Sequence, residues 1–162
     1  MLARLRKSEE KEGGFTLIEL LVAMIIIGIL AAIAIPVFLS QRKKAQDAAA
    51  KADVSTIGKE VATYYVDGVG STASGAMAIT NSGGRYVLNV TAAAGPPVVD
   101  AIANQDLGKV SANNVLAAQQ FIDDTHWCVS VTNSKGDKAV AGFKYSAKGG
   151  LDTGVCGAAD VT

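Results

Sequence analysis

An apolar run near the start of the chain constrains its fold more than any other feature. From Phe15 to Leu39 the sequence reads FTLIELLVAMIIIGILAAIAIPVFL, 25 residues with one charged side chain, Glu19. A helix of this length measures ~37 Å, more than the roughly 30 Å hydrocarbon core of a bilayer. Apolar residues lie on every face, and the ~120 residues that follow are too few to bury such a helix on all sides. The run therefore predicts a membrane segment.

Composition and charge favour a structural role over catalysis. The chain has 15 basic and 15 acidic side chains, and its charged fraction of 19% lies below the roughly 25% of an average soluble domain. The neutral balance does not favour a nucleic-acid partner, although it leaves one open. One His and two Cys are too few for common zinc sites, and nothing around His126 supports a catalytic triad. We therefore expect neither an enzyme nor a metal or cofactor site. Five aspartates without EF-hand spacing are expected on solvated surface: Asp123, Asp124, Asp137, Asp152 and Asp160.

The first fourteen residues, MLARLRKSEEKEGG, predict a leader that is removed. A secretory signal also places basic residues before an apolar stretch, but it is cut after that stretch at small residues. Here the apolar run continues through Pro36 into basic sequence without such an exit, and Gly13-Gly14 precedes the run instead. Cleavage after Gly14 would leave the apolar segment on the mature chain.

The stretch Gly14-Phe15-Thr16-Leu17-Ile18-Glu19-Leu20-Leu21-Val22 resembles the processing site of type IV pilins and related prepilin-like proteins. The resemblance covers the leader and about the first 50 residues of the mature chain. It implies a prepilin peptidase that cuts between Gly14 and Phe15 on the cytoplasmic side and then methylates the new amino group of Phe15. It also implies a single-pass precursor in the cytoplasmic (inner) membrane, with its N-terminus inside. The pilus assembly machinery would then build a homopolymer of identical subunits at the cell surface.

Glu19 is the one charge in the apolar run, and it needs a partner. A carboxylate costs on the order of 2.5–3.5 kcal/mol at the bilayer centre and less near an end. The resemblance implies that Glu19 pairs with the amino terminus of Phe15 in a neighbouring subunit, which would recruit the subunit into the polymer. The alternative is a carboxylate that reaches back to the lipid headgroups. Pairing between subunits is the better interpretation.

Gly28 and Pro36 interrupt the apolar helix. Proline removes one backbone hydrogen bond, and glycine costs roughly 1 kcal/mol against alanine. Membrane helices tolerate both, so an ordinary kink is one interpretation. The family resemblance implies another, in which the stretch between them loosens when subunits move from lipid into the fibre.

Residues 40–66 predict an amphipathic continuation of the same helix, in which small and apolar side chains recur at spacings of three and four. Its alanines would admit a neighbouring backbone, whereas Ile57, Val61 and Tyr64 offer more area to a folded domain. Asp67-Gly68 is expected to end the helix. A helix of residues 15–66 would measure ~78 Å, too long to be buried by its own domain. The segment therefore predicts partners.

The remainder predicts a small antiparallel β-sheet packed on the end of the helix, an α+β pilin fold. Residues 67–84 are rich in Gly, Ser and Thr and are expected to form a connecting loop, and the sheet domain would occupy residues 85–162. Residues 98–120 have no clear period, and the tail from Gly149 is expected to be loop. The strand-like runs are 85–91, 127–132 and 139–146, with a hairpin signal at 133–138.

Cys128 and Cys156 are expected to form a disulfide that closes the C-terminal region. A domain of this size has little core, and closing a loop of about 28 residues would stabilise it by roughly 3.5 kcal/mol. Two unrelated buried thiols are the alternative. Basic residues are equally numerous on both sides of the apolar run, so they do not decide the orientation. The leader and an oxidising exterior for the disulfide together favour an inside N-terminus and an outside domain.

Three functions remain open. The leading one is a structural subunit, the major pilin, of a type IV pilus. The alternative is a pseudopilin of a type II secretion system or a competence (DNA-uptake) pilin; major pseudopilins of that system use a calcium loop near the C-terminus. The third, a monomeric membrane-anchored binding domain, does not account for the Gly14-Phe15-Glu19 arrangement. The sequence does not choose between adhesion, motility and DNA uptake.

Overall fold

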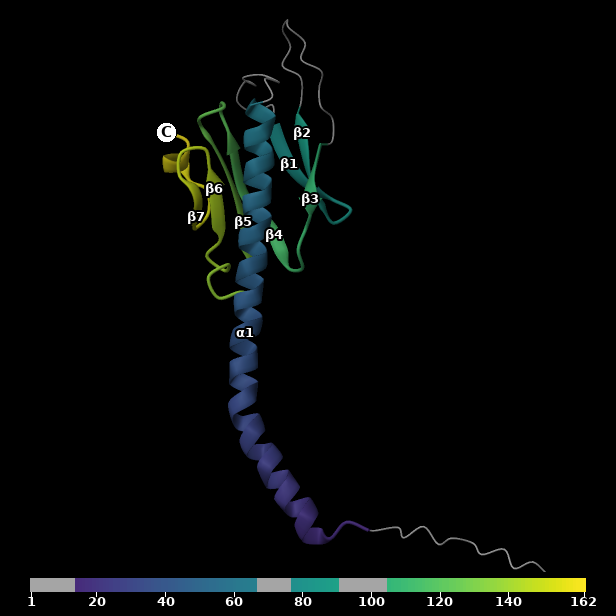
Figure 1. Cartoon of the computed structure of the whole chain (residues 1–162). Coiled ribbons are helices and arrows are strands. Elements are labelled where there is room, and N and C mark those ends of the chain that lie inside the picture. Colours follow the sequence, from purple (N-terminus) through teal and green to yellow (C-terminus); the bar gives the residue numbers. More distant parts are fainter. Residues whose placement is uncertain (1–13, 67–76, 91–104) are drawn as a thin grey trace, which may run out of the picture. The chain divides into compact units, whose positions relative to one another are not determined.

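The computed structural model describes residues 14–66, 77–90 and 105–162 (Figure 1). Most of the predicted leader, and residues 67–76 of the predicted loop, therefore lie outside the described residues. The chain divides after Leu39 into two compact units, residues 1–39 and residues 40–162.

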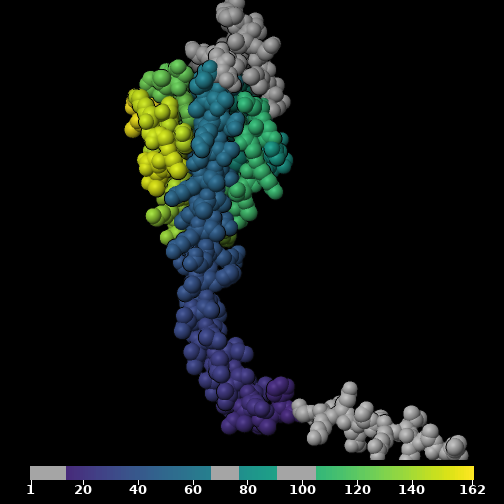
Figure 2. Space-filling view, viewed as in Figure 1, coloured from purple at the N-terminus to yellow at the C-terminus, as the bar shows by residue number. Residues whose placement is uncertain are grey.

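A single helix, α1 (Leu17–Val66), carries the apolar run. In the first unit the large apolar side chains of α1 are exposed, from Leu17 at 81% to Leu39 at 51% (Figure 2). By length and composition α1 is the one helix among the described residues that could cross a membrane. The helix continues through Gly28 and Pro36, so the prediction of one long N-terminal helix is confirmed.

Seven strands form two antiparallel sheets in the second unit, with the orders β1-β2-β3 and β4-β5-β6-β7. In chain order they are β1 (Met77–Ser82), β2 (Arg85–Val90), β3 (Gln105–Lys109), β4 (Asn114–Phe121), β5 (Trp127–Asn133), β6 (Phe143–Ser146) and β7 (Gly150–Thr153). A 3₁₀ turn, η1 (Ala158–Asp160), follows them. In Figure 1 the C-terminal half of α1 has β1–β3 on one side and β5–β7 on the other. The α+β class is confirmed, with two sheets where one was predicted.

The predicted loop over residues 67–84 is wrong for Met77–Ser82, which forms β1 and pairs with β2. Gly83 and Gly84 make the two-residue turn between these strands, with φ of 59° and 76°. Such a turn needs positive φ at both positions, which glycine adopts without strain, so a Gly-Gly pair between two strand-like runs was an available signal. Within the ambiguous region, residues 98–120, residues 105–109 form β3 and residues 114–120 belong to β4; residues 98–104 lie outside the described residues.

The C-terminal part also differs from its prediction. The tail from Gly149 was expected to be loop, yet Gly150–Thr153 forms β7, because pairing with β6 gives it structure that its own sequence does not indicate. The antiparallel pairing of β5 with β6 is as predicted, but β6 begins only at Phe143. Residues 139–142 of the predicted strand do not join β6 because they form turns, in which the Ala141 N–H donates to the Lys138 carbonyl and the Gly142 N–H to the Ala139 carbonyl.

One face of α1 forms the core of the second unit together with both sheets. Its buried residues are Ala50, Asp53, Val54, Ile57, Gly58, Val61 and Tyr64. Burial of Ile57, Val61 and Tyr64 confirms the predicted apolar contacts, whereas Ala48 and Ala52 are exposed in this chain. From the sheets, the largest fully buried side chains include Tyr86 and Phe143.

Asp53 is a carboxylate buried within this core, 8% exposed, and sequence analysis did not single it out. Its oxygens accept hydrogen bonds from the Tyr86 hydroxyl (3.2 Å), from the Ser111 N–H and hydroxyl (2.9 and 2.7 Å), and from the Asn114 side-chain amide (2.7 Å). A buried carboxylate is tolerable only when such donors replace water. Asp53 therefore fixes α1 against β2 and against the segment that leads into β4.

Asp47 makes a second polar attachment of α1. It accepts hydrogen bonds from the backbone N–H groups of Asp137 (2.9 Å), Lys138 (3.1 Å) and Ala139 (2.9 Å). Desolvation raises the pKa of Asp47, but the three backbone donors outweigh it, and the pKa lies below its ordinary value. Asp47 thus holds the β5–β6 connection on the helix as a carboxylate.

The Gln119 side chain joins the two sheets. Its Oε1 accepts a hydrogen bond from the Ile79 N–H (2.6 Å), and its Nε2 donates to the Ile79 carbonyl (3.0 Å). An amide that bonds both backbone groups of one residue acts as a neighbouring strand would, so Gln119 of β4 extends the pairing of β1.

Candidate functional site

The start of α1 brings Thr16 and Glu19 together. Glu19 Oε2 accepts hydrogen bonds from the Thr16 N–H and from the Thr16 hydroxyl, both at 2.8 Å, and the Thr16 hydroxyl accepts one from the Glu19 N–H at 3.3 Å. This reciprocal pattern is a capping box. It satisfies backbone N–H groups in the first turn of the helix, which have no carbonyl partner within the helix. The spacing Thr-x-x-Glu was a signal for it that sequence analysis missed.

Capping leaves part of the Glu19 carboxylate free. In the described part of the chain Oε2 takes both Thr16 hydrogen bonds, and Oε1 takes none. An ionised carboxylate has about four acceptor positions, so capping does not use up its capacity. Glu19 is exposed and lies four residues from Phe15. The Glu19 side chain can therefore cap the start of α1 and still pair with a cation from another molecule.

Gly14 and Phe15, between which cleavage is predicted, are both exposed, Phe15 at 89%. A Cβ added at Gly14 would meet nothing within 4 Å. The fold therefore does not itself require a glycine at this position. A requirement for a small residue would come from an enzyme that has to approach the backbone closely.

Gly28 also lies in open space, with nothing within 4 Å of an added Cβ. Pro36 lies inside α1, where it supplies no backbone N–H. Neither residue serves packing within the described chain, so their role in loosening the helix remains a prediction.

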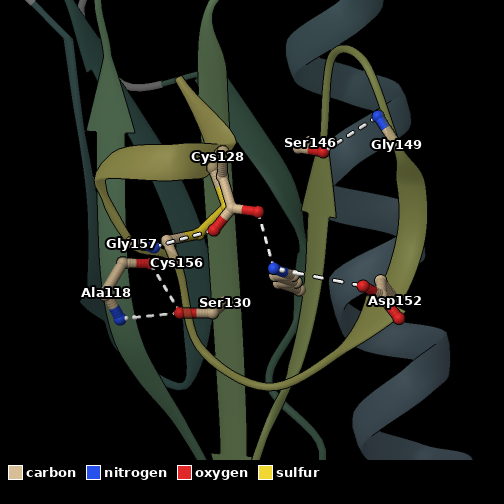
Figure 3. The surroundings of a disulfide bond; sticks show 10 residues. Ala118, Cys128, Ser130, Ser146, Gly149, Asp152, Cys156 and Gly157 are labelled. Carbon is tan, nitrogen blue, oxygen red and sulfur yellow. Dashed lines mark hydrogen bonds and ion pairs between the residues drawn. A yellow bond between two sulfur atoms is a disulfide. The ribbon is translucent and has the colours of Figure 1, made fainter. Parts of the chain in front are cut away.

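Cys128 and Cys156 form the predicted disulfide, with their Cα atoms 5.8 Å apart (Figure 3). Cys128 lies in β5 and is fully buried, and Cys156 precedes η1 and is 8% exposed. The bond ties the C-terminal segment to the centre of the four-stranded sheet. It leaves no free thiol in the part of the chain described.

An ion pair reinforces this closure. The Lys144 Nζ atom lies 2.6 Å from Oδ1 of Asp160 and 4.0 Å from Oδ2 of Asp152. The Lys144 and Asp160 side chains are 18% and 14% exposed, so water screens the pair only in part. The Lys144 hydrogen bond, together with the N–H of Gly157, lowers the pKa of Asp160. The disulfide thus anchors the segment just before η1, and the partly buried charge pair of Asp160 holds η1 itself.

The other aspartates considered as calcium ligands, Asp123, Asp124 and Asp137, do not form a group that could hold a metal ion. Asp123 pairs with His126 Nδ1 at 2.8 Å, and this hydrogen bond contributes most to lowering the pKa of Asp123 to about 2. Asp137 lies in the β5–β6 connection that Asp47 holds. Among residues 14–66, 77–90 and 105–162, no group of three or more His, Cys, Asp or Glu side chains could hold a metal ion.

Comparison with known proteins identifies the N-terminal motif. Residues 11–35 match the family described as "Prokaryotic N-terminal methylation motif". The chain therefore carries a prepilin-type N-terminus, and this stretch includes Gly14, Phe15 and Glu19.

Its relatives are a pilin and secretion-system core proteins. The chain is 39% identical to the type II secretion system core protein G of Pseudomonas aeruginosa over 35% of its own length and 40% of the relative's. It is 34% identical to the type IV major pilin protein PilA of Myxococcus xanthus over 57% and 43% of the two lengths. The core protein G of Escherichia coli is 31% identical over 38% and 42%. The chain thus spans about two fifths of the curated relatives that it matches. No solved structure matches it.

Proposed function

We propose that this chain is the major structural subunit of a type IV pilus. It enters the cytoplasmic membrane as a prepilin with its N-terminus inside, and a prepilin peptidase cleaves it between Gly14 and Phe15 and methylates Phe15. The assembly machinery then moves it into a homopolymer, in which the apolar helices pack together and the sheets face outward. Adhesion, motility and DNA uptake are roles that such a fibre can serve.

The observation that carries this proposal is the position of one carboxylate. Glu19 is the only charged residue from Phe15 to Leu39, and it lies inside the matched motif, as the fifth residue after the predicted cleavage. Its Oε1 takes no hydrogen bond within the described chain, and every large apolar side chain from Leu17 to Leu39 is exposed. An exposed apolar helix with one acceptor near its start suits a bundle of identical helices, in which the amino group of a neighbouring Phe15 meets that acceptor.

Two observations favour a pilin over a type II secretion pseudopilin. The match to the Myxococcus xanthus pilin covers 94 residues and therefore must extend past the end of α1, whereas matches to core protein G cover 57 to 61. The C-terminal segment is also closed by the Cys128–Cys156 bond and the Lys144–Asp160 pair. In a major pseudopilin, a calcium loop would be expected in this region instead. A pseudopilin remains the second candidate because its motif and helix would be the same.

The test is to delete the gene and restore it with a version that carries an epitope tag. Sheared surface material is then examined by electron microscopy with a labelled antibody, and secretion of enzymes is assayed in parallel. A major pilin is expected to give abundant labelled filaments that disappear on deletion, while secretion continues. Loss of secretion without loss of surface filaments would identify a pseudopilin and overturn the proposal.

A further inference from the structure

Three consecutive basic residues follow the apolar run in α1, and the fold gives them no partner among the residues that the structure describes. Arg42, Lys43 and Lys44 are all exposed. Within the described residues none of their side chains donates a hydrogen bond or forms an ion pair. Consecutive residues of a helix point about 100° apart, so the three side chains cover more than half of its circumference. They form a collar of positive charge, the 42–44 collar.

The charged groups nearest to the collar along α1 are already engaged. Asp47, the next acid, accepts hydrogen bonds from three backbone N–H groups of the β5–β6 connection. Lys51, the next base, lies with its Nζ 5.0 Å from the ring centre of Phe143. The helix therefore neither neutralises the collar nor adds Lys51 to it.

The position of the collar along the helix matches the thickness of a bilayer. Arg42 and Lys44 lie 25 and 27 residues after Leu17, the first residue of α1. At 1.5 Å per residue these separations are ~38 and ~40 Å along the helix, and a bilayer with its headgroup regions is about 40–45 Å thick. When Leu17 lies at one boundary, the collar reaches the headgroups of the opposite leaflet. Long basic side chains also extend their charge toward such a layer.

We infer that Arg42, Lys43 and Lys44 bind the phosphate groups of anionic phospholipids in the outer-facing leaflet while the subunit resides in the membrane. The inference rests on the proposed function, because it takes the precursor as a single span with its N-terminus inside. The contact would hold the processed subunit at a fixed depth. It would have to break when the subunit leaves the lipid, so anionic lipid content would oppose assembly.

The experiment uses the processed chain, residues 15–162, in nanodiscs that contain equal amounts of phosphatidylglycerol and phosphatidylcholine, because the leader carries four basic side chains of its own. Native mass spectrometry of the released protein counts each lipid that stays bound. Wild-type protein is expected to retain phosphatidylglycerol in severalfold excess, since each basic residue at an anionic surface strengthens association about fivefold. The variant R42Q/K43Q/K44Q is expected to lose that excess, and R42K/K43R/K44R to keep it.

A matched control removes the same charge elsewhere. Lys59, Lys135 and Lys138 are exposed and lie outside the collar, so K59Q/K135Q/K138Q is expected to retain lipid as the wild type does. Equal retention of both lipids by the wild type would overturn the inference. The inference would also be overturned if R42Q/K43Q/K44Q retained the phosphatidylglycerol excess but did not assemble into filaments, since the collar would then bind a second copy of the chain. If the protein inserts normally but shows no lipid preference, only this inference fails; if it does not insert, the proposed function fails as well.

Discussion

The ring of Tyr145 in β6 lies against Gly58 of α1, in the space that a larger residue at position 58 would need. A Cβ built on Gly58 would overlap the Cβ, Cγ and Cδ1 atoms of Tyr145. The Tyr145 ring also stacks on Trp127, with centroids 6.0 Å apart and planes 8° apart. The chain accepts a glycine inside a helix, at a cost of roughly 1 kcal/mol against alanine, and gains a close approach of sheet to helix.

Gly58→Ala is therefore expected to lower the free energy of unfolding by up to about 2 kcal/mol, although alanine is the better helix former. Adding a methyl group to a packed core costs about 1–3 kcal/mol, which exceeds the gain in propensity. Denaturant unfolding of the purified chain measures the difference. Gly28→Ala, which adds its methyl group in open space, is the control and should not destabilise the second unit. If Gly58→Ala were equally costly in a Tyr145→Ala background, the ring would not be the cause.

The disulfide should account for a large share of the stability of the second unit. Cys128 and Cys156 are 28 residues apart, and a loop of that length is worth roughly 3.5 kcal/mol in the chain-entropy account. Replacing both by alanine is expected to lower the free energy of unfolding by about 3 kcal/mol. Non-reducing peptide mapping of assembled protein should recover both in one linked fragment. Two thiols open to alkylation there would contradict the prediction.

Acid should weaken the closure of the C-terminal segment through Asp160. Its hydrogen bonds from Lys144 and Gly157 lower its pKa below the ordinary 3.8. Near that pH the unfolded chain binds more protons than the folded one, so the stabilising effect is complete well above pH 3.8 and is lost as the pH falls through the lower folded pKa. Thermal unfolding from pH 7 to pH 2 should show a shallower acid decline for Asp160→Asn. Asp152→Asn, 4.0 Å from Lys144 with a 64% exposed side chain, should keep the wild-type slope.

Processing is expected to remove residues 1–14 and to add one methyl group to Phe15. The leader carries four basic and three acidic side chains, so its loss leaves 11 basic and 12 acidic ones in the mature chain. Mass spectrometry of surface material measures the mature terminus directly. An intact leader in that material would contradict the pilin proposal.

Glu19→Ala is expected to abolish filaments without blocking cleavage. The bond after Gly14 is unchanged, and loss of the only charge in the apolar run should make membrane insertion easier. Assembly should fail because the amino group of Phe15 would enter an apolar bundle without a carboxylate, and an unpaired charge there is strongly unfavourable. Membrane fractionation and electron microscopy should show processed protein in the membrane and no surface filaments.

Glu19→Gln separates the charge from the helix cap. Glutamine can complete a capping box, so this variant keeps the contact with Thr16 but removes the charge. It is expected to fail in assembly as Glu19→Ala does. Filaments at the wild-type yield from Glu19→Gln would assign the role of Glu19 to capping and contradict pairing between subunits. Glu60→Ala, a loss of charge in the second half of α1, should assemble normally.

Several features follow from the order of residues along the chain. The length and uninterrupted apolar character of residues 15–39 predict the helix, because both are local and need no knowledge of what lies nearby. The stretch from Gly14 to Glu19 likewise belongs to the matched N-terminal motif, which is defined by consecutive residues and does not depend on the fold. The Gly83-Gly84 pair was also a local signal for the turn between β1 and β2, although these residues were predicted to lie in a loop.

The tertiary structure decided how distant polar and small residues are used. Asp53 lies on the same helix as exposed charged residues, and only its donors on Tyr86, Ser111 and Asn114 make its burial possible. A glycine is needed at position 58 only because the Tyr145 ring packs there. The division into two sheets likewise depends on pairings of residues far apart in sequence. Periodicity reports which side chains avoid water, but the partners that satisfy a buried polar group, or fill the space above a glycine, come together only when the chain folds.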